Sequence, residues 1–195
     1  MLTCTIESKQ LTLTSSKRGG RKMRPKTSAT FALALSLLLP LTTALRAADA
    51  MDTPSGSVIL TVSGTIDKTN VDDTAQFDLE MLRELPAASI STSTIWTEGV
   101  LMFTGVPIAL LLEELGNSGN TLRASAINDY TIEIPVASLE GDAPILAYEM
   151  NGDTMHRREK GPLWVIYPFD SDEKYRTSQI YSRSIWQLDR IEVID

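Results

Sequence analysis

The sequence has very few of the residues on which most catalytic sites depend. Of its 195 residues, only Cys4 is a cysteine and only His156 is a histidine. Because Cys4 lies within the first fifty residues, the rest of the chain has no disulfide, no thiolate nucleophile and no thiolate metal ligand. A lone histidine also excludes any metal site built on two imidazoles. The short motifs typical of dinucleotide, phosphate, zinc and serine-hydrolase sites are absent too. The residue pattern therefore assigns no catalytic residue and no metal-binding residue.

The first fifty residues have a layout of their own. A basic stretch at 17–26 is followed by an apolar run at 31–45 and then by the small residues Ala48-Asp49-Ala50. This order is typical of a secretory signal peptide. The apolar run is shorter than the roughly 20 residues that span a bilayer. An uncleaved membrane anchor is the alternative interpretation.

We therefore expect residues 1–50 to be an N-terminal extension with a secretory signal peptide, and residues 51–195 to be one domain. We expect that domain to be periplasmic or secreted, with no membrane insertion after cleavage. The N-terminus has no Arg-Arg pair before the apolar run, so the general secretory route is expected rather than the twin-arginine route. Met1 and Met23 are both possible starts.

Charge is unevenly distributed along the chain. Residues 51–195 carry 10 basic and 23 acidic residues, a net charge of −13. Such a surface repels nucleic acid and anionic lipid, which bind through clustered Lys and Arg. Within it, residues 157–190 carry seven basic against five acidic residues and six of the chain's twelve aromatic residues. This segment is the exception in an acidic domain.

Many short β-rich segments and two convincing helices predict an α+β or mostly-β domain. The expected helices cover residues 78–85, which end at Pro86, and 107–116, which begin at a proline and end at a glycine. The expected strands cover 58–64, 89–95, 121–126, 130–135, 145–150, 163–167 and 185–194. Asn128-Asp129 and Asn151-Gly152 are predicted turns.

Several segments, in order, resemble one known family. They are Phe103 to Ile108 with the sequence FTGVPI, Asn128 to Pro135 with NDYTIEIP, Leu146 to Gly152 with LAYEMNG, Lys160 to Pro168 with KGPLWVIYP, and Ile185 to Val193 with IWQLDRIEV. Their order and spacing resemble the oxidoreductase molybdopterin-binding domain of the sulfite oxidase family. The resemblance covers about residues 56–195 and implies that family's α+β fold with mixed sheets.

The resemblance also implies where a cofactor would bind. Catalytic members hold molybdenum through one cysteine thiolate on a segment that corresponds here to Ser91–Trp96, which has no cysteine. Thr92 or a neighbour stands at the ligand position, and a threonine hydroxyl cannot replace a thiolate on molybdenum. Trp164 and Ile185 stand where the family tends to have an arginine and a lysine that hold the pterin and its phosphate. We therefore expect no cofactor, although the resemblance itself implies molybdopterin.

Residues 157–190 suggest a pocket for a small anionic or planar ligand. In that interpretation the basic side chains face the Ser91–Trp96 segment across a concave surface, with aromatic walls. In the other interpretation the aromatic residues are core and the cations are surface partners of carboxylates. The candidate pocket residues are Thr92, Ser93, Trp96, Asn128, Tyr130, His156, Arg157, Arg158, Lys160, Trp164, Tyr181 and Arg183.

Three classes of function remain open. The first is a non-catalytic exported module that binds a small ligand or a partner protein. The second is a periplasmic molybdopterin-dependent oxidoreductase with an unusual metal-ligand set. The third is an accessory subunit of a larger complex, with a membrane-bound redox or sensor protein as its partner. The sequence identifies neither the ligand nor the oligomeric state.

Overall fold

The computed structural model describes residues 51–195. The predicted signal peptide lies outside the described residues. The strands are β1 (Leu60–Gly64), β2 (Ala75–Phe77), β3 (Ala88–Ser93), β4 (Val100–Pro107), β5 (Thr121–Ala126), β6 (Thr131–Pro135), β7 (Ile145–Met150), β8 (Asp153–Thr154), β9 (Leu163–Ile166) and β10 (Trp186–Ile194). The helices are α1 (Leu79–Glu84), α2 (Ile108–Glu114) and α3 (Ser178–Arg183), with 3-10 turns η1 (Val136–Ser138) and η2 (Glu173–Tyr175). The expected α+β, mostly-β fold class is confirmed.

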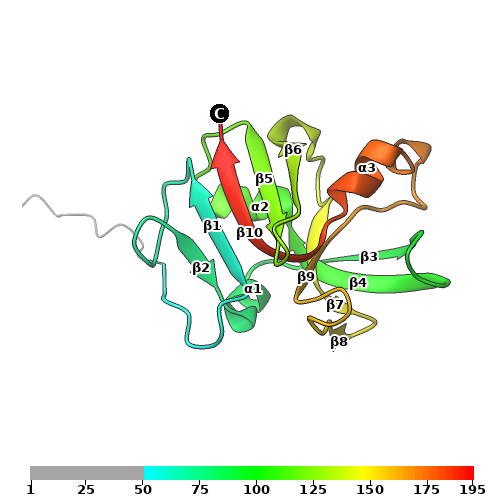
Figure 1. The fold of residues 1–195 in the computed structure, drawn as a ribbon, viewed down its shortest axis with the longest axis horizontal. Coiled ribbons are helices and arrows are strands. Elements are labelled where there is room, and N and C mark those ends of the chain that lie inside the picture. Colours follow the sequence, from blue (N-terminus) through cyan, green and yellow to red (C-terminus); the bar gives the residue numbers. More distant parts are fainter. Residues whose placement is uncertain (1–50) are drawn as a thin grey trace, which may run out of the picture. The chain divides into compact units, whose positions relative to one another are not determined.

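β10 is the strand that joins the two halves of the sheet (Figure 1). At its start it pairs with β9, with Trp186 opposite Trp164. Along the rest of its length it pairs parallel with β1 and antiparallel with β5. One half of the sheet is therefore β2-β1-β10-β5-β6, and the other continues from β10 through β9, β7 and β4 to β3, with β8 beside β7.

The change of partners coincides with a break in the regularity of β10. The register shifts on both sides of Leu188, and the preceding Gln187 has a positive φ of 53°. The backbone N–H of Gln187 donates to Lys160 O, and its carbonyl accepts from Ile127 N. A bulge of this kind redirects the neighbouring side chains. Here the bulge directly follows Trp186.

Two groups of buried side chains form the core. The larger includes Leu60, Leu111 and Leu188 of the β1-β10-β5 half and its helices, and continues over one face of β7 and β9 through Leu146 and Val165. The smaller lies on the opposite face of these strands and contains Phe103, Ile145, Ala147, Met155, Trp164 and Ile166. Trp96, in the β3–β4 connection, packs against both groups. It therefore lies between the two core groups.

Local signals explain the elements that the sequence predicted. Asp78 caps α1 by accepting a hydrogen bond from Met81 N at 3.0 Å. Asn151 and Gly152 both have positive φ and form the tight turn between β7 and β8. Asp129, with φ 63°, lies in the turn between β5 and β6. The structure adds β2, β4, β8 and α3 to the predicted elements. Within residues 51–195, no helix is both long and apolar enough to cross a membrane.

Candidate ligand pocket

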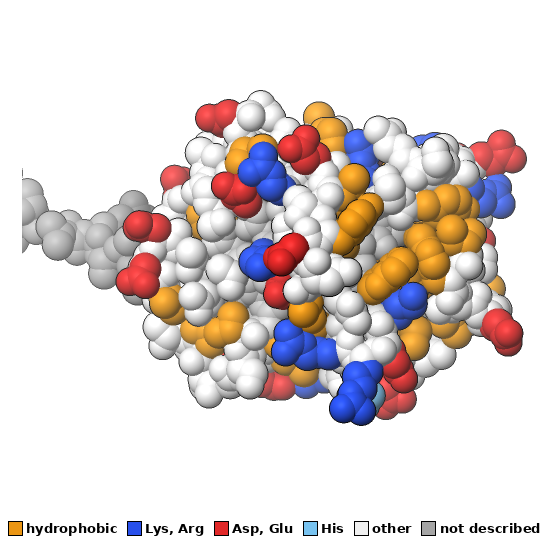
Figure 2. Space-filling model, viewed as in Figure 1, with side chains coloured by type: hydrophobic (Ala, Val, Ile, Leu, Met, Phe, Trp, Pro, Cys, Tyr) orange, Lys and Arg blue, Asp and Glu red, His pale blue; other side chains and the backbone are white. Residues whose placement is uncertain are grey.

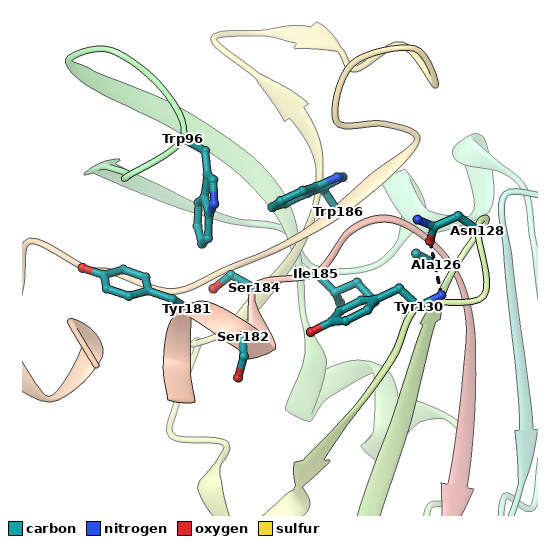
Figure 3. A pocket seen from close by; sticks show the side chains of 9 residues that line it. All are labelled: Trp96, Ala126, Asn128, Tyr130, Tyr181, Ser182, Ser184, Ile185 and Trp186. Atoms are coloured by element: carbon teal, nitrogen blue, oxygen red, sulfur yellow. Dashed lines mark hydrogen bonds between the residues drawn. The ribbon is translucent and has the colours of Figure 1, made fainter. Parts of the chain in front are cut away.

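A cavity of about 320 Å³ lies where the two halves of the sheet meet. Its walls come from the β3–β4 connection, the β5–β6 turn, α3 and the start of β10 (Figure 3). The lining residues are Trp96, Ala126, Asn128, Tyr130, Tyr181, Ser182, Ser184, Ile185 and Trp186. Four of the nine are aromatic, and none carries a charge. A few hundred cubic ångströms is the lower end of the range for pockets that hold drug-sized ligands.

Trp96 is the centre of the aromatic wall. Its ring lies 5.6 Å from that of Trp186 and 5.8 Å from that of Tyr181, centroid to centroid, at interplanar angles of 69° and 89°. Edge-to-face contacts of this kind are favoured by the ring quadrupoles. Because the three rings meet at steep angles, they form the sides of a recess instead of a stack (Figure 3).

The polar atoms of the pocket are already partly engaged. Ser182 Oγ donates to Gln179 O at 2.7 Å, and Ser184 Oγ donates to Ile180 O at 2.9 Å. Asn128 Oδ1 accepts from Tyr130 N at 3.2 Å (Figure 3). Each serine hydroxyl keeps its lone pairs for another partner, and the Asn128 amide keeps its two N–H donors.

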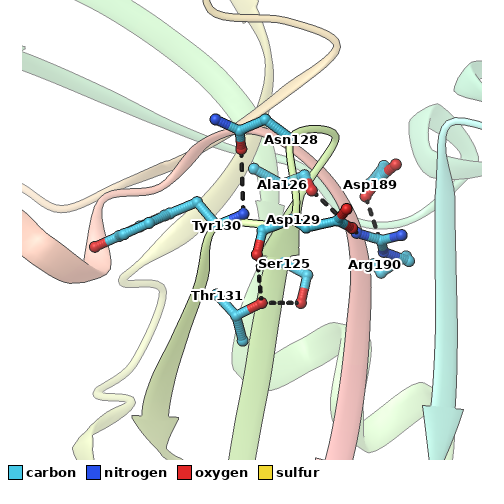
Figure 4. A network of polar contacts seen from close by, with 8 residues as sticks. All are labelled: Ser125, Ala126, Asn128, Asp129, Tyr130, Thr131, Asp189 and Arg190. Carbon is cyan, nitrogen blue, oxygen red and sulfur yellow. Dashed lines mark hydrogen bonds and ion pairs between the residues drawn. The ribbon is translucent and has the colours of Figure 1, made fainter.

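An ion-pair network holds the turn that carries Asn128 and Tyr130 (Figure 4). Arg190 Nη2 donates to Asp129 Oδ1 at 2.8 Å and to Ala126 O at 3.0 Å. On its other side, Arg190 Nε lies 3.3 Å from Asp189 Oδ1. The side chain of Tyr130 is half exposed and extends from this anchored turn over the cavity. The arginine therefore fixes the turn without lining the pocket.

Thr92 and Ser93 are bonded to the protein itself. Ser93 donates from its backbone N–H and its hydroxyl to the carboxylate of Asp170, at 2.5 and 2.7 Å. Thr92 is fully buried, and its Oγ1 accepts from Asp170 N at 3.1 Å and donates to Ser93 O. The expectation that these hydroxyls line a pocket is wrong, because both are held by the loop around Asp170. Trp96 follows directly and does line the cavity.

Trp164 is a core residue and not a pocket wall. Its side chain is fully buried among Phe103 and the strands of the smaller core group. Its indole N–H donates to Ser184 O at 3.1 Å, so it supports the pocket from behind. The sequence-based placement of Trp164 in the wall is therefore corrected.

The cations expected around the pocket lie elsewhere. Arg157 and Arg158 line a separate surface hollow with His156 and Glu159. Arg183 is buried, and its Nη1 lies 3.5 Å from Ser138 Oγ. Figure 2 shows apolar side chains gathered on the half of the domain that carries α3 and the β3–β4 hairpin. The predicted ring of positive charge around the pocket is wrong, because adjacency in the sequence did not fix the direction of these side chains.

Lys160 comes nearer than the arginines. Its Nζ lies 3.9 Å from the ring centroid of Trp186 and 5.5 Å from that of Trp164. It is nevertheless not one of the lining residues. The alternative interpretation, in which surface carboxylates pair with the cations, holds for Lys174, Arg176 and Arg190. Within residues 51–195, Arg157, Arg158, Lys160 and Arg183 form no such ion pair.

Five pocket residues were not among the candidates. They are Ala126, Ser182, Ser184, Ile185 and Trp186. All but Ala126 lie within residues 182–186, in the segment that leads from α3 into β10. The available signal was Trp186 at the start of the last predicted strand, directly after a serine-rich, aromatic stretch.

Comparison with known proteins identifies the family. The model of the oxidoreductase molybdopterin-binding domain matches residues 50–171. The chain belongs to this family. Among solved structures, 29 chains match, one of them the sulfane dehydrogenase SoxCD from Paracoccus pantotrophus, with a TM-score of 0.50 and 18% identity. That match covers 70% of this chain and 38% of the other, so it shows a shared fold. A search of curated protein sequences finds no match.

The donor set of this oxidoreductase molybdopterin-binding domain does not fit a molybdenum centre. Residues 51–195 contain no cysteine, and no three His, Asp or Glu side chains among them gather in a metal-binding group. At the position that corresponds to the metal ligand, the Thr92 hydroxyl is buried and bonded to Ser93 and Asp170.

Proposed function

We propose that the chain is an exported, non-catalytic member of its family that binds a small organic ring compound without molybdenum. The observation that carries this proposal is the uncharged cavity of about 320 Å³ between Trp96, Tyr181, Trp186 and the Tyr130 turn. Aromatic walls stabilise flat organic groups by burial and by ring contacts. An anion, which the sequence also suggested, finds no cation among the lining residues.

The absence of a thiolate supports the part of the proposal that concerns molybdenum. The cavity also lacks the acid, base and nucleophile pairs that mark most catalytic sites. Its polar groups are two serine hydroxyls, two tyrosines, two indole N–H groups and an amide. These groups suit recognition, in which hydrogen bonds fix the orientation of a ligand that apolar walls hold.

Indole is a suitable first probe because it is flat, neutral and small. The protein, produced from the full chain with ¹⁵N-labelled tryptophan, is titrated with indole and followed by NMR. We expect the side-chain N–H signals of Trp96 and Trp186 to shift, with a Kd of about 1 mM or below for so small a probe. The N–H signal of Trp164, which is buried behind the wall and bonded to Ser184 O, is expected to shift less than these two.

Two variants separate the pocket from the rest of the surface. Tyr130→Ala removes a half-exposed wall and is expected to weaken indole binding several-fold. Ile95→Ala removes an exposed apolar side chain next to Trp96 that does not line the cavity, and is expected to leave the affinity unchanged. Equal affinity in all three proteins, or no shift at Trp96 and Trp186, contradicts the proposal.

The family itself supports one other function, that of a molybdopterin-dependent oxidoreductase. Elemental analysis and a pterin fluorescence assay distinguish the two. The protein is purified from a host that makes the cofactor, next to a known molybdenum protein as the positive control. We expect no stoichiometric molybdenum. Stoichiometric molybdenum with pterin supports the enzyme and contradicts our proposal.

A further inference from the structure

The two serine hydroxyls of the pocket can serve a ligand only as hydrogen-bond acceptors. A serine hydroxyl has a single proton, and Ser182 and Ser184 both donate theirs to carbonyl groups of α3. What remains for a ligand is their lone pairs. A ligand group that meets these serines therefore has to donate a hydrogen bond.

The aromatic walls favour a positive charge. Trp, Tyr and Phe rings attract a cation placed over a ring face within about 6 Å of the centroid, and groups of such rings recognise ammonium ligands. The pocket brings together Trp96, Tyr130, Tyr181 and Trp186 with no Lys or Arg among the lining residues. Lys160 already uses this property, since its ammonium lies 3.9 Å from the centroid of Trp186.

The charge of the whole domain acts in the same direction. Residues 51–195 have a net charge of −13. A strongly acidic surface raises the local concentration of small cations and lowers that of anions. The ammonium of Lys160, beside Trp186, opposes this effect locally.

We infer that the ligand of this pocket is a small organic cation, a protonated amine carried on an apolar or aromatic frame. This inference rests on the proposed ligand-binding function. The ammonium N–H groups donate to the oxygens of Ser182 and Ser184, and the rings of Trp96, Tyr181 and Trp186 surround the charge. The apolar frame packs on Ile185 and Tyr130.

Three probes with the same ring test the sign of the charge. They are tryptamine, protonated at neutral pH, then indole, which is neutral, and indole-3-acetate, an anion. All three are titrated at one ionic strength, with the Trp96 and Trp186 N–H signals as the readout. We expect tryptamine to bind about tenfold more tightly than indole and indole-3-acetate to bind more weakly than indole.

The outcomes separate this inference from the function on which it rests. If none of the three probes shifts the two signals, the ligand-binding function fails. If indole or indole-3-acetate binds as tightly as tryptamine, binding stands and the preference for a cation is overturned.

A lysine variant gives an independent test. Lys160→Met removes the ammonium beside Trp186 and is expected to tighten tryptamine several-fold and to weaken indole-3-acetate. Lys174→Met is the matched control, because Lys174 also lies over a ring, that of Tyr175, but pairs with Glu140 and does not line the pocket. Weaker tryptamine binding in Lys160→Met, with Lys174→Met unchanged, overturns the inference.

Discussion

Asp170 accepts two hydrogen bonds from Ser93, at 2.5 Å from the backbone N–H and at 2.7 Å from the hydroxyl. These two bonds lower the pKa of the Asp170 carboxyl. They also tie the loop before η2 to the end of β3, three residues before Trp96. The contact therefore stabilises the fold and also helps to position Trp96, a wall of the pocket.

The lowered pKa of Asp170 predicts acid sensitivity. A carboxylate with a folded pKa below its unfolded value stabilises the fold above the unfolded value, about 3.9, and loses this effect as the pH falls through the folded pKa. Asp78, whose pKa is lowered by the N–H groups of Met81 and Gly56, adds to it. We expect the midpoint of urea unfolding to be level above about pH 5 and to fall below pH 4.

Asp170→Asn tests how much this one carboxylate contributes to the loss of stability in acid. The variant should be less stable than the wild type at pH 7, and the difference should narrow as the pH falls below 4. Glu98→Gln, an acidic residue of the β3–β4 loop that bonds to none of the described residues, is the control. An unchanged pH profile in Asp170→Asn would show that the Ser93 contact adds nothing to stability.

Replacing the buried Tyr167 with phenylalanine is predicted to stabilise the fold. The tyrosine side chain is 1% exposed, and its hydroxyl has no hydrogen-bond partner among the described residues. Leaving a buried hydroxyl unpaired costs about 1–3 kcal/mol. Tyr167→Phe keeps the ring and removes the hydroxyl, so we expect the free energy of unfolding to rise by about 1 kcal/mol. Tyr130→Phe, at a half-exposed position, should change it little.

Alkaline unfolding checks the same residue by another route. Burial raises the pKa of Tyr167 to about 12. A group whose folded pKa is raised loses its contribution as the pH rises from the unfolded value, about 10, through the folded one. The wild type should lose stability over this range more steeply than Tyr167→Phe. Equal slopes, or a less stable Phe variant, would mean that the hydroxyl is satisfied.

Replacing Arg190 is predicted to weaken ligand binding without a large loss of stability. Arg190→Gln removes the bonds to Ala126 O and Asp129 that hold the β5–β6 turn. Because the pair is exposed, we expect the free energy of unfolding to fall by less than about 1 kcal/mol. The amide signals of the turn should shift, and indole binding should weaken several-fold.

Arg123→Gln is the matched control for Arg190→Gln. Arg123 is a similarly exposed arginine on β5 that pairs with Glu192 and Glu133, away from the pocket. It should lose stability to a similar extent and keep its affinity for indole. If the two variants lose affinity equally, Arg190 has no specific role in positioning Tyr130.

The N-terminal layout predicts export. We expect the mature protein to begin within a few residues of Asp49 to Met51, as measured by N-terminal sequencing of the periplasmic fraction of a bacterial host. Leu38→Arg places a charge in the apolar run and should block processing, whereas Ser28→Arg, between the basic stretch and the apolar run, should not. A wild-type chain that begins at Met1 or Met23 and sediments with membranes would contradict export.

The sequence predicted the regular parts of the fold and missed elements with weak local signals. Alternation and turn residues located β5, β6 and β7, and a cap and a proline located α1 and α2. Helix α3 was missed because Ser178–Arg183 is too short and polar to show an apolar face, although Thr177 is a good cap for it. β4 was missed because Gly99 precedes its apolar residues and Gly105 interrupts them.

The candidate site was only partly predictable, because it depends on contacts distant in the sequence. Trp96, Asn128, Tyr130 and Tyr181 do meet at one cavity. The arginines do not, because the sequence leaves the direction of their side chains open. At Arg157, for example, the hydrogen bond from Gln187 fixes the backbone carbonyl and not the side chain. Thr92 and Ser93 were assigned to a ligand because nothing in their own segment indicates Asp170, more than seventy residues later, as their partner.

The shared strand β10 sets the order in which the protein can fold. Thr65, directly after β1, bonds to Val193, 128 residues further along the chain. β1, β5 and β9 all take β10 as a partner, so none of these pairings can form while the ribosome is still making residues 186–194. Pairings between such distant segments also form slowly, since a long loop has to close first. A nascent chain therefore lacks the strand that joins the two halves of its sheet until the last residues of the domain have been made.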